Sequence, residues 1–216
     1  MNSYYMHGPV YGVVSDNKDP EKQARVKVAL KSLGDSIVTN WIPVLNLYGS
    51  SKCGAFFLPE VGDQVIVGFI GDNSERGIVL GGIWSNKQPP PQTAENKGSD
   101  LNKDGKNNLR FIKSRSGHKI ILDDKDGEEK LQIISSDGAT RHEFLVKEKK
   151  INIKTDVDLR LSAAGSLGIK AEKGKLSFDK GLKVEVDELS VESKGKNTKL
   201  KGSQNITLDG SSVTLN

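Results

Sequence analysis

From about residue 150 to the C-terminus, apolar and polar residues alternate almost without interruption. Side chains alternate between the two faces of a β-strand, so this pattern predicts a series of strands that each have one narrow apolar face. The alternation changes register after Gly174 and again before Leu189. The first run comprises Ile151, Ile153, Val157, Leu159, Leu161, Ala163, Leu167, Ile169 and Ala171, the second comprises Leu176, Phe178, Leu182, Val184 and Val186, and the remainder comprises Leu189, Val191, Ile206, Leu208, Val213 and Leu215.

A stripe this narrow cannot be buried within one chain, and we expect two further copies of the chain to cover it. Three identical chains wound about one axis would enclose the apolar side chains and pair the backbone groups between chains. Folding and trimer formation would then be a single event. An ordinary β-sandwich over residues 109–216 is the alternative, although the scarcity of aromatic residues there argues against it. The residues expected at the trimer axis are Ile151, Ile153, Val157, Leu159, Leu161, Ile169, Leu176, Phe178, Val184, Val186, Ile206 and Leu208.

Residues 8–84 have a different pattern, in which short apolar runs alternate with turn signals. No stretch shows a sustained helical period, and Gly, Asp or Asn flank most of the runs. Five or six short strands in about 80 residues predict a small closed or partly closed barrel, with the aromatic residues of these runs mostly in its core. The predicted strands are residues 9–14, 24–30, 41–47, 55–59, 64–70 and 77–84.

The organisation of the chain follows from where these patterns stop and resume. Residues 86–108 contain almost no apolar side chain and include three consecutive prolines, so we expect a linker there. Strand patterns separated by Gly-containing or charged turns resume over residues 109–146. The expected domains are therefore a barrel over residues 1–87, a linker over 88–108 and an extended β domain over 109–216. The predicted fold class is all-β.

Composition limits the possible partners. The net charge is +4, but acidic and basic residues are interspersed along the whole chain, which is typical of a solvated surface and does not predict a nucleic-acid partner. The single cysteine, Cys53, cannot form an internal disulfide. The sequence starts without a signal-peptide pattern, and no apolar run is long enough to span a membrane, so we expect a product made in the cytoplasm.

Catalytic chemistry is not expected from the sequence. The acidic pairs Asp123–Asp124 and Glu128–Glu129 lie in charged, turn-like stretches, and His118 is an isolated imidazole. No apolar pocket is evident that would raise a carboxyl pKa, and neither phosphate-binding glycine motifs nor metal-ligand spacings are present. We therefore expect a non-enzymatic protein without cofactors or bound metals.

Several segments resemble a known family. The most specific are GAFFLPEVGDQVIVGF at residues 54–69 and ERGIVLGGIW at residues 75–84. They are similar to the oligonucleotide/oligosaccharide-binding (OB) barrel of phage baseplate assembly protein V and of the related VgrG spikes of type VI secretion systems. In that family, early barrel strands occupy the positions of residues 25–30 and 41–44, and the β-helix begins with a segment that residues 108–124 resemble. The resemblance implies an OB-fold barrel followed by an intertwined three-chain β-helix.

The same resemblance implies a homotrimeric central spike at the tip of a contractile injection apparatus, such as a phage tail, a tailocin or a secretion particle. The OB domain would attach the spike to the apparatus, and the β-helix would puncture the outer membrane of the target cell. Only a short segment precedes the barrel, so we expect the hub to be a separate protein. The linker over residues 88–108 is too short to hold the lysozyme domain that some phage spikes insert.

The C-terminus differs from spikes that end in a His-x-His metal-binding tip. We therefore expect no apical metal and a separate tip protein of the proline-alanine-alanine-arginine (PAAR) repeat type, in contact with Val213, Thr214, Leu215 and Asn216. The alternative function is an OB-fold binding module for single-stranded nucleic acid or polysaccharide with a β-solenoid C-terminal domain.

Overall fold

The regular structure of this chain consists of β-strands. The computed structural model describes residues 8–34, 36–71, 73, 75–93, 105–195, 198–199, 201–203, 206–207 and 210–211, and no helix occurs among them, which confirms the all-β class. Backbone contacts divide the chain into one unit that ends at Leu159 and a second that starts at Arg160. The predicted boundaries at residues 87 and 108 remain predictions.

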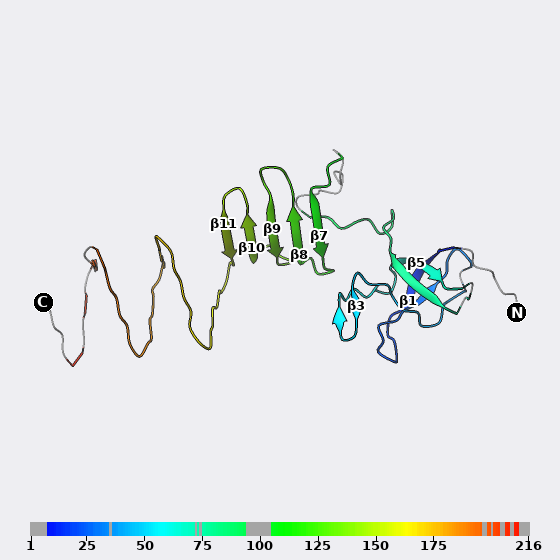
Figure 1. The fold of residues 1–216 in the computed structure, drawn as a ribbon, viewed down its shortest axis with the longest axis horizontal. Coiled ribbons are helices and arrows are strands. Elements are labelled where there is room, and N and C mark those ends of the chain that lie inside the picture. The colour runs from blue at the N-terminus through cyan, green and yellow to red at the C-terminus, as the bar shows by residue number, and fades with distance from the viewer. Residues whose placement is uncertain are drawn as a thin grey trace. The chain divides into compact units, whose positions relative to one another are not determined.

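The N-terminal sheet has four antiparallel strands in the order β2–β1–β5–β6 (Figure 1). These strands are β1 (Val10–Asp16), β2 (Lys27–Ala29), β5 (Gln64–Phe69) and β6 (Gly77–Gly82). All four fall within predicted strands, except that β1 extends two residues further than expected. A separate two-stranded hairpin joins β3 (Gly49–Ser50) to β4 (Cys53–Gly54).

Residues 37–45 close this sheet into a barrel. The chain there pairs with the β2 side through reciprocal hydrogen bonds between Val26 and Ile42, and with β6 through the bond from Leu45 N to Val79 O. Val79 N in turn donates to Pro43 O. The expected strand at residues 41–47 is thus reduced to isolated bridges, because Pro43 has no N–H to donate to a regular ladder.

The barrel core consists almost entirely of β-branched residues. Alternate positions of β1, β2 and β5 point inward, since a strand places every second side chain on the same face. The buried cluster comprises Val10, Val14, Val26, Val28, Leu30, Ile42, Val65, Val67 and Val79. The core thus belongs to the barrel and needs no second chain.

Two expectations about this region are wrong. Residues 55–59 form no strand, and the aromatic side chains of Tyr48, Phe56, Phe57 and Trp84 are exposed rather than in the core. The buried core is made up mostly of valines, and these aromatic rings are not part of it. They lie on the outside of the barrel instead.

A second sheet is an antiparallel meander of five strands in the order β7–β8–β9–β10–β11. Three of its four turns contain a glycine with left-handed backbone geometry, and the fourth has Lys149 at a φ of 50°. The strands agree with the sequence pattern, and they are the last ones in the described residues. They are β7 (Leu109–Lys113), β8 (Lys119–Asp123), β9 (Lys130–Ile134), β10 (Arg141–Leu145) and β11 (Lys150–Lys154).

Gly12 tests the packing of the barrel, because β1 lies close against β2 there. A Cβ atom at Gly12 would lie 2.3 Å from Val28 Cγ1 and 3.0 Å from the carbonyl oxygen of Ala29. We expect Gly12→Ala to destabilise the barrel by about 1–3 kcal/mol through overpacking. Thermal unfolding followed by tryptophan fluorescence measures this change, since Trp41 and Trp84 are the only tryptophans.

Gly82→Ala is the matched control, because a Cβ atom there meets only Gln64 O at 3.8 Å. Equal melting temperatures of the two variants would contradict the assigned pairing of β1 with β2.

Candidate assembly site

The five-stranded meander has one apolar face and one mixed face. Residues directly opposite each other in an antiparallel ladder share a face, so the register assigns every side chain. One face, here called the apolar sheet face, has Arg110 and His142 as its only polar members. Its other members are Ile112, Ile120, Leu122, Leu131, Ile133, Phe144, Ile151 and Ile153.

The two faces differ in how well the chain covers them. On the mixed face Ile121 is 0% exposed and Ile134 is 6% exposed. Polar side chains there pair with one another, for example Gln132 Nε2 with Glu143 Oε1 at 2.7 Å. The eight apolar side chains of the apolar sheet face are 37–65% exposed. A contiguous exposed apolar surface of this kind marks an interaction site.

The apolar stripe continues beyond β11 through a series of short extended segments. The described chain bends at residues 156–157, 164–165, 172–173, 179–180, 187 and 194–195, at intervals of seven or eight residues. The two register changes of the stripe, from Ala171 to Leu176 and from Val186 to Leu189, each span one of these bends. Each straight segment therefore keeps its apolar residues on one side.

Among the described residues, the backbone of residues 158–192 forms no hydrogen bond with another backbone group. Figure 1 shows the C-terminal unit as successive extended stretches that alternate in direction. Extended backbone in a folded protein normally pairs its N–H and C=O groups with neighbouring strands.

The predicted axis residues can now be placed. Ile151 and Ile153 belong to β11 and lie on the apolar sheet face. The other described members are each more than half exposed: Val157, Leu159, Leu161, Ile169, Leu176, Phe178, Val184, Val186 and Ile206. Leu208 and the predicted tip contacts Val213, Thr214, Leu215 and Asn216 lie outside the described residues. Whether the placed residues meet at a trimer axis is part of the proposal below.

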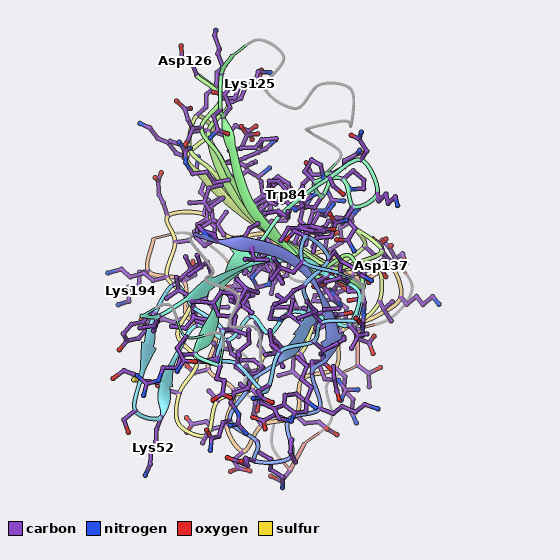
Figure 2. The ribbon with its side chains drawn as sticks, turned by 90° about the vertical axis from the view of Figure 1, so that its right-hand side faces the viewer. Lys52, Trp84, Lys125, Asp126, Asp137 and Lys194 are labelled. Atoms are coloured by element: carbon purple, nitrogen blue, oxygen red, sulfur yellow. The ribbon has the colours of Figure 1, made fainter. Side chains whose placement is uncertain are left out.

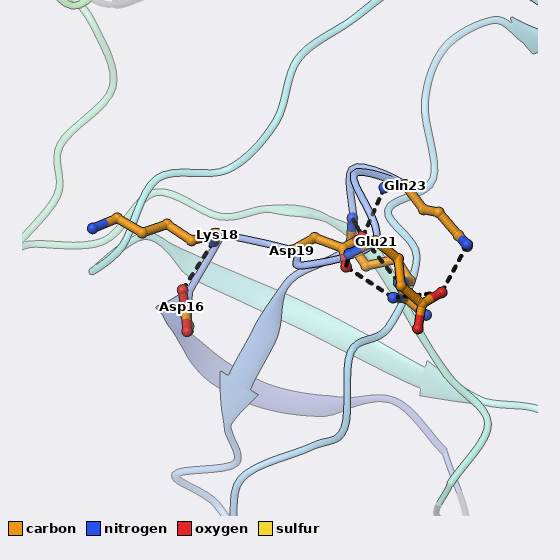
Figure 3. Close-up of polar contacts among 6 residues, drawn as sticks. Asp16, Lys18, Asp19, Glu21 and Gln23 are labelled. Atoms are coloured by element: carbon orange, nitrogen blue, oxygen red, sulfur yellow. Dashed lines mark hydrogen bonds and ion pairs between the residues drawn. The ribbon is translucent and has the colours of Figure 1, made fainter.

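In the barrel, a network centred on Asp19 fixes the loop between β1 and β2 (Figure 3). The Asp19 side chain is 3% exposed, and its Oδ1 accepts hydrogen bonds from Glu21 N and, at 2.8 Å, from Arg25 Nη2. Its Oδ2 accepts from Gln23 N at 2.9 Å and from Arg25 Nε at 3.0 Å. These bonds hold Lys22 and Ala24 in left-handed backbone geometry, with φ near 56° and 57°. The network thus fixes the course of the loop that leads from β1 into β2.

The electrostatics of this pair follow from its geometry. Hydrogen bonds from the Arg25 guanidinium hold the pKa of the Asp19 carboxyl well below its usual range. The Asp19 carboxylate in turn raises the pKa of Arg25. Both groups are therefore ionised at neutral pH.

The hairpin of β3 and β4 and its flanks form an exposed segment, residues 45–58, here called the apolar arm. Its large side chains include Leu47, which is 92% exposed, together with Tyr48, Phe56 and Phe57. Lys52 is its only charged residue, and Figure 2 shows it at the tip of the hairpin. The sequence interpretation missed this surface, because it assigned the aromatic run at residues 55–59 to a core strand. The sequence did contain a signal against a core strand, because no polar residues alternate with the apolar ones in that run.

Among the described residues of a single chain, no three or more His, Cys, Asp or Glu side chains are grouped so that they could hold a metal ion. The described residues also include no helix long and apolar enough to cross a membrane.

These features define an all-β protein with a barrel that has its own core and an apolar sheet face that the described residues leave exposed. Residues 10–84 match the family model of the type VI secretion system/phage-baseplate injector OB domain. The match includes every strand of the barrel, so the barrel is consistent with an OB domain and supports a relation to the baseplate protein V and VgrG group. No curated protein matches the chain. The match indicates a structural role among the components of a phage baseplate or related injector.

The Asp19 network generates a prediction about pH. The depressed pKa of Asp19 means that its carboxylate stabilises the folded barrel above the usual aspartate pKa of about 3.9, and this contribution is lost as the pH falls below that value. We expect Asp19→Asn to lower the melting temperature at pH 7. The difference from the wild type should shrink as the pH is lowered from about 4 towards 2.

Glu21→Gln is the control, because Glu21 is an exposed partner of the same arginine at 3.2 Å. Its effect on the melting temperature should be smaller at every pH. A deficit of Asp19→Asn that stays constant down to pH 2 would show that the charge of Asp19 is not what holds the loop.

Proposed function

We propose that this chain is the homotrimeric central spike of a contractile injection apparatus, with the barrel as its attachment module and residues 109–216 as its needle. The single observation that carries the proposal is the combination of an exposed apolar sheet face with extended segments, residues 158–192, that form no backbone–backbone hydrogen bond among the described residues. Other copies of the same chain supply both missing partners at once. The match of residues 10–84 to an injector domain supports the same assignment.

The length of the segments favours three copies. A straight stretch of about six residues, such as residues 158–163, is about 20 Å long. Three such sides form a triangle whose faces lie about 6 Å from its axis. Packed sheets lie about 10 Å apart, so one layer of apolar side chains fills this depth. Four sides would place the faces about 10 Å from the axis and leave it hollow.

The resulting prism would be stiff and soluble. Segments from the other two chains would lie between successive segments of one chain, so that hydrogen bonds run continuously along the needle. The positions opposite the stripe carry charged residues such as Lys183 and Glu185, which form an exposed ion pair. A narrow, rigid shaft of this kind would concentrate the force of contraction and puncture the envelope of the target cell. The spike acts mechanically, without catalysis.

The proposal includes two further partners, one at each end of the spike. The apolar arm of the barrel, which has a single charge, is suited to permanent attachment to a separate hub protein, since stable interfaces have apolar, aromatic-rich centres. Residues 213–216 at the other end would contact a separate PAAR-type tip protein. The spike would be incorporated in a phage, tailocin or secretion particle and delivered to the target envelope.

Val184→Asp tests the assembly. Because it would place three carboxylates on the apolar axis, we expect it to abolish the trimer. Size-exclusion chromatography with light scattering should give three times the chain mass of 23.5 kDa for the wild type. Lys183→Asp is the matched control, since it introduces the same charge on the opposite side of the same segment and should leave the mass unchanged.

The injector role is tested with the same two variants in purified contractile particles. Immunoblotting should detect the wild type and Lys183→Asp in the particles but not Val184→Asp. A stable wild-type monomer of 23.5 kDa, or a trimer that Val184→Asp leaves intact, would refute the proposed axis.

A further inference from the structure

His142 interrupts the apolar sheet face with a metal-ligating side chain. In the register of β10 it lies directly between Ile133 of β9 and Ile153 of β11. It also lines a hollow of about 560 Å³ together with Ile112, Ile120 and Ile133, which lie on the same face. In the sheet, the imidazole is therefore flanked by Ile133 and Ile153 on a face that the proposed trimer would bury. Polar and charged residues also line the hollow, namely Ser114, His118, Lys119, Ser135, Thr140 and Arg141.

The imidazole of His142 has no hydrogen-bond partner among the described residues. His118 provides the contrast, because its Nδ1 accepts a hydrogen bond from Ser136 N at 3.2 Å. Burying a polar side chain without a partner is unfavourable. In a trimer, His142 thus needs a partner that the chain itself does not supply.

The other polar member of the apolar sheet face does not meet this need. Arg110 forms an ion pair with Asp124, and its guanidinium can only donate hydrogen bonds. A neutral imidazole, in contrast, presents a nitrogen lone pair.

Threefold symmetry brings three copies of His142 to one level of the axis. The meander strands are five residues or about 17 Å long, so three such sheets would form a triangle whose faces lie about 5 Å from that axis. An imidazole that extends inward, with a further bond of about 2.0 Å to a zinc ion, spans this depth. Three symmetric nitrogens also match a common zinc ligand set, in which water occupies the fourth position.

We propose that the three His142 side chains of the trimer bind one divalent transition-metal ion of the zinc class on the axis of the needle. This proposal rests on the proposed trimer. Imidazole nitrogen suits zinc, copper, nickel and iron, whereas magnesium and calcium prefer oxygen ligands. The ion satisfies three otherwise unpartnered groups at once and fixes the three chains at the same height.

Zinc binding by the purified full-length chain tests this site. After treatment with EDTA and dialysis against zinc chloride, mass spectrometry of the bound metal should find one zinc ion per three chains. Zinc should also raise the melting temperature of the trimer. With cobalt(II) in place of zinc, the visible absorption bands of a four-coordinate ion should appear.

Two variants separate the site from adventitious binding. His142→Leu should remain a trimer, because leucine suits the apolar sheet face, but should bind zinc at least about tenfold more weakly and lose the cobalt bands. His118→Asn, which retains a hydrogen-bond acceptor for Ser136 N, should bind zinc like the wild type.

The outcomes distinguish this proposal from the proposed function. A wild-type trimer that binds no zinc, or a His142→Leu trimer that binds as much as the wild type, overturns the metal site and leaves the spike intact. A wild-type chain that is monomeric overturns the spike and the metal site together.

Discussion

The constraint on which the rest of the structure depends is the extended backbone of residues 158–192, which forms no backbone–backbone hydrogen bond among the described residues. Extended segments whose N–H and C=O groups lack partners cannot form a stable fold by themselves. The exposed apolar side chains of the same segments add a second requirement for a covering surface. In the proposed trimer, identical segments of the other chains would meet both requirements, and folding of this region and its assembly would be one process.

The barrel and the rest of the chain differ in how far they bury their apolar side chains and pair their backbone groups. The barrel encloses a core of valines and closes its sheet through residues 37–45, so its stability is a property of one chain. The meander of β7–β11 pairs its own backbone but leaves its apolar sheet face open, and the segments after β11 leave both backbone and side chains open. Exposure of apolar side chains and of unpaired backbone thus increases from the barrel through the meander to the described segments after β11. Such a gradient suits a particle component in which one end attaches and the other forms a shaft.

Much of this organisation could be predicted from the sequence, because alternation of apolar and polar residues reports directly on strands. The strands of the meander and most of the barrel agree with that pattern, and Ile151 and Ile153 lie on the face that the pattern predicted. Closure by residues 37–45 could not be predicted, since it depends on pairing between segments distant in the sequence, whereas the missing alternation in residues 55–59 was a signal for the exposure of Phe56 and Phe57. Local pattern also could not reveal His142, which gains its importance only from the register of β10.

Amide hydrogen–deuterium exchange of the assembled protein tests the central claim most directly. If segments of neighbouring chains pair along the needle, peptides from residues 158–193 should exchange as slowly as those of the barrel strands β1 and β5. Protection of the 158–193 peptides should disappear in the Val184→Asp variant while the barrel remains protected. Rapid exchange across residues 158–193 in the wild-type assembly would contradict pairing between chains.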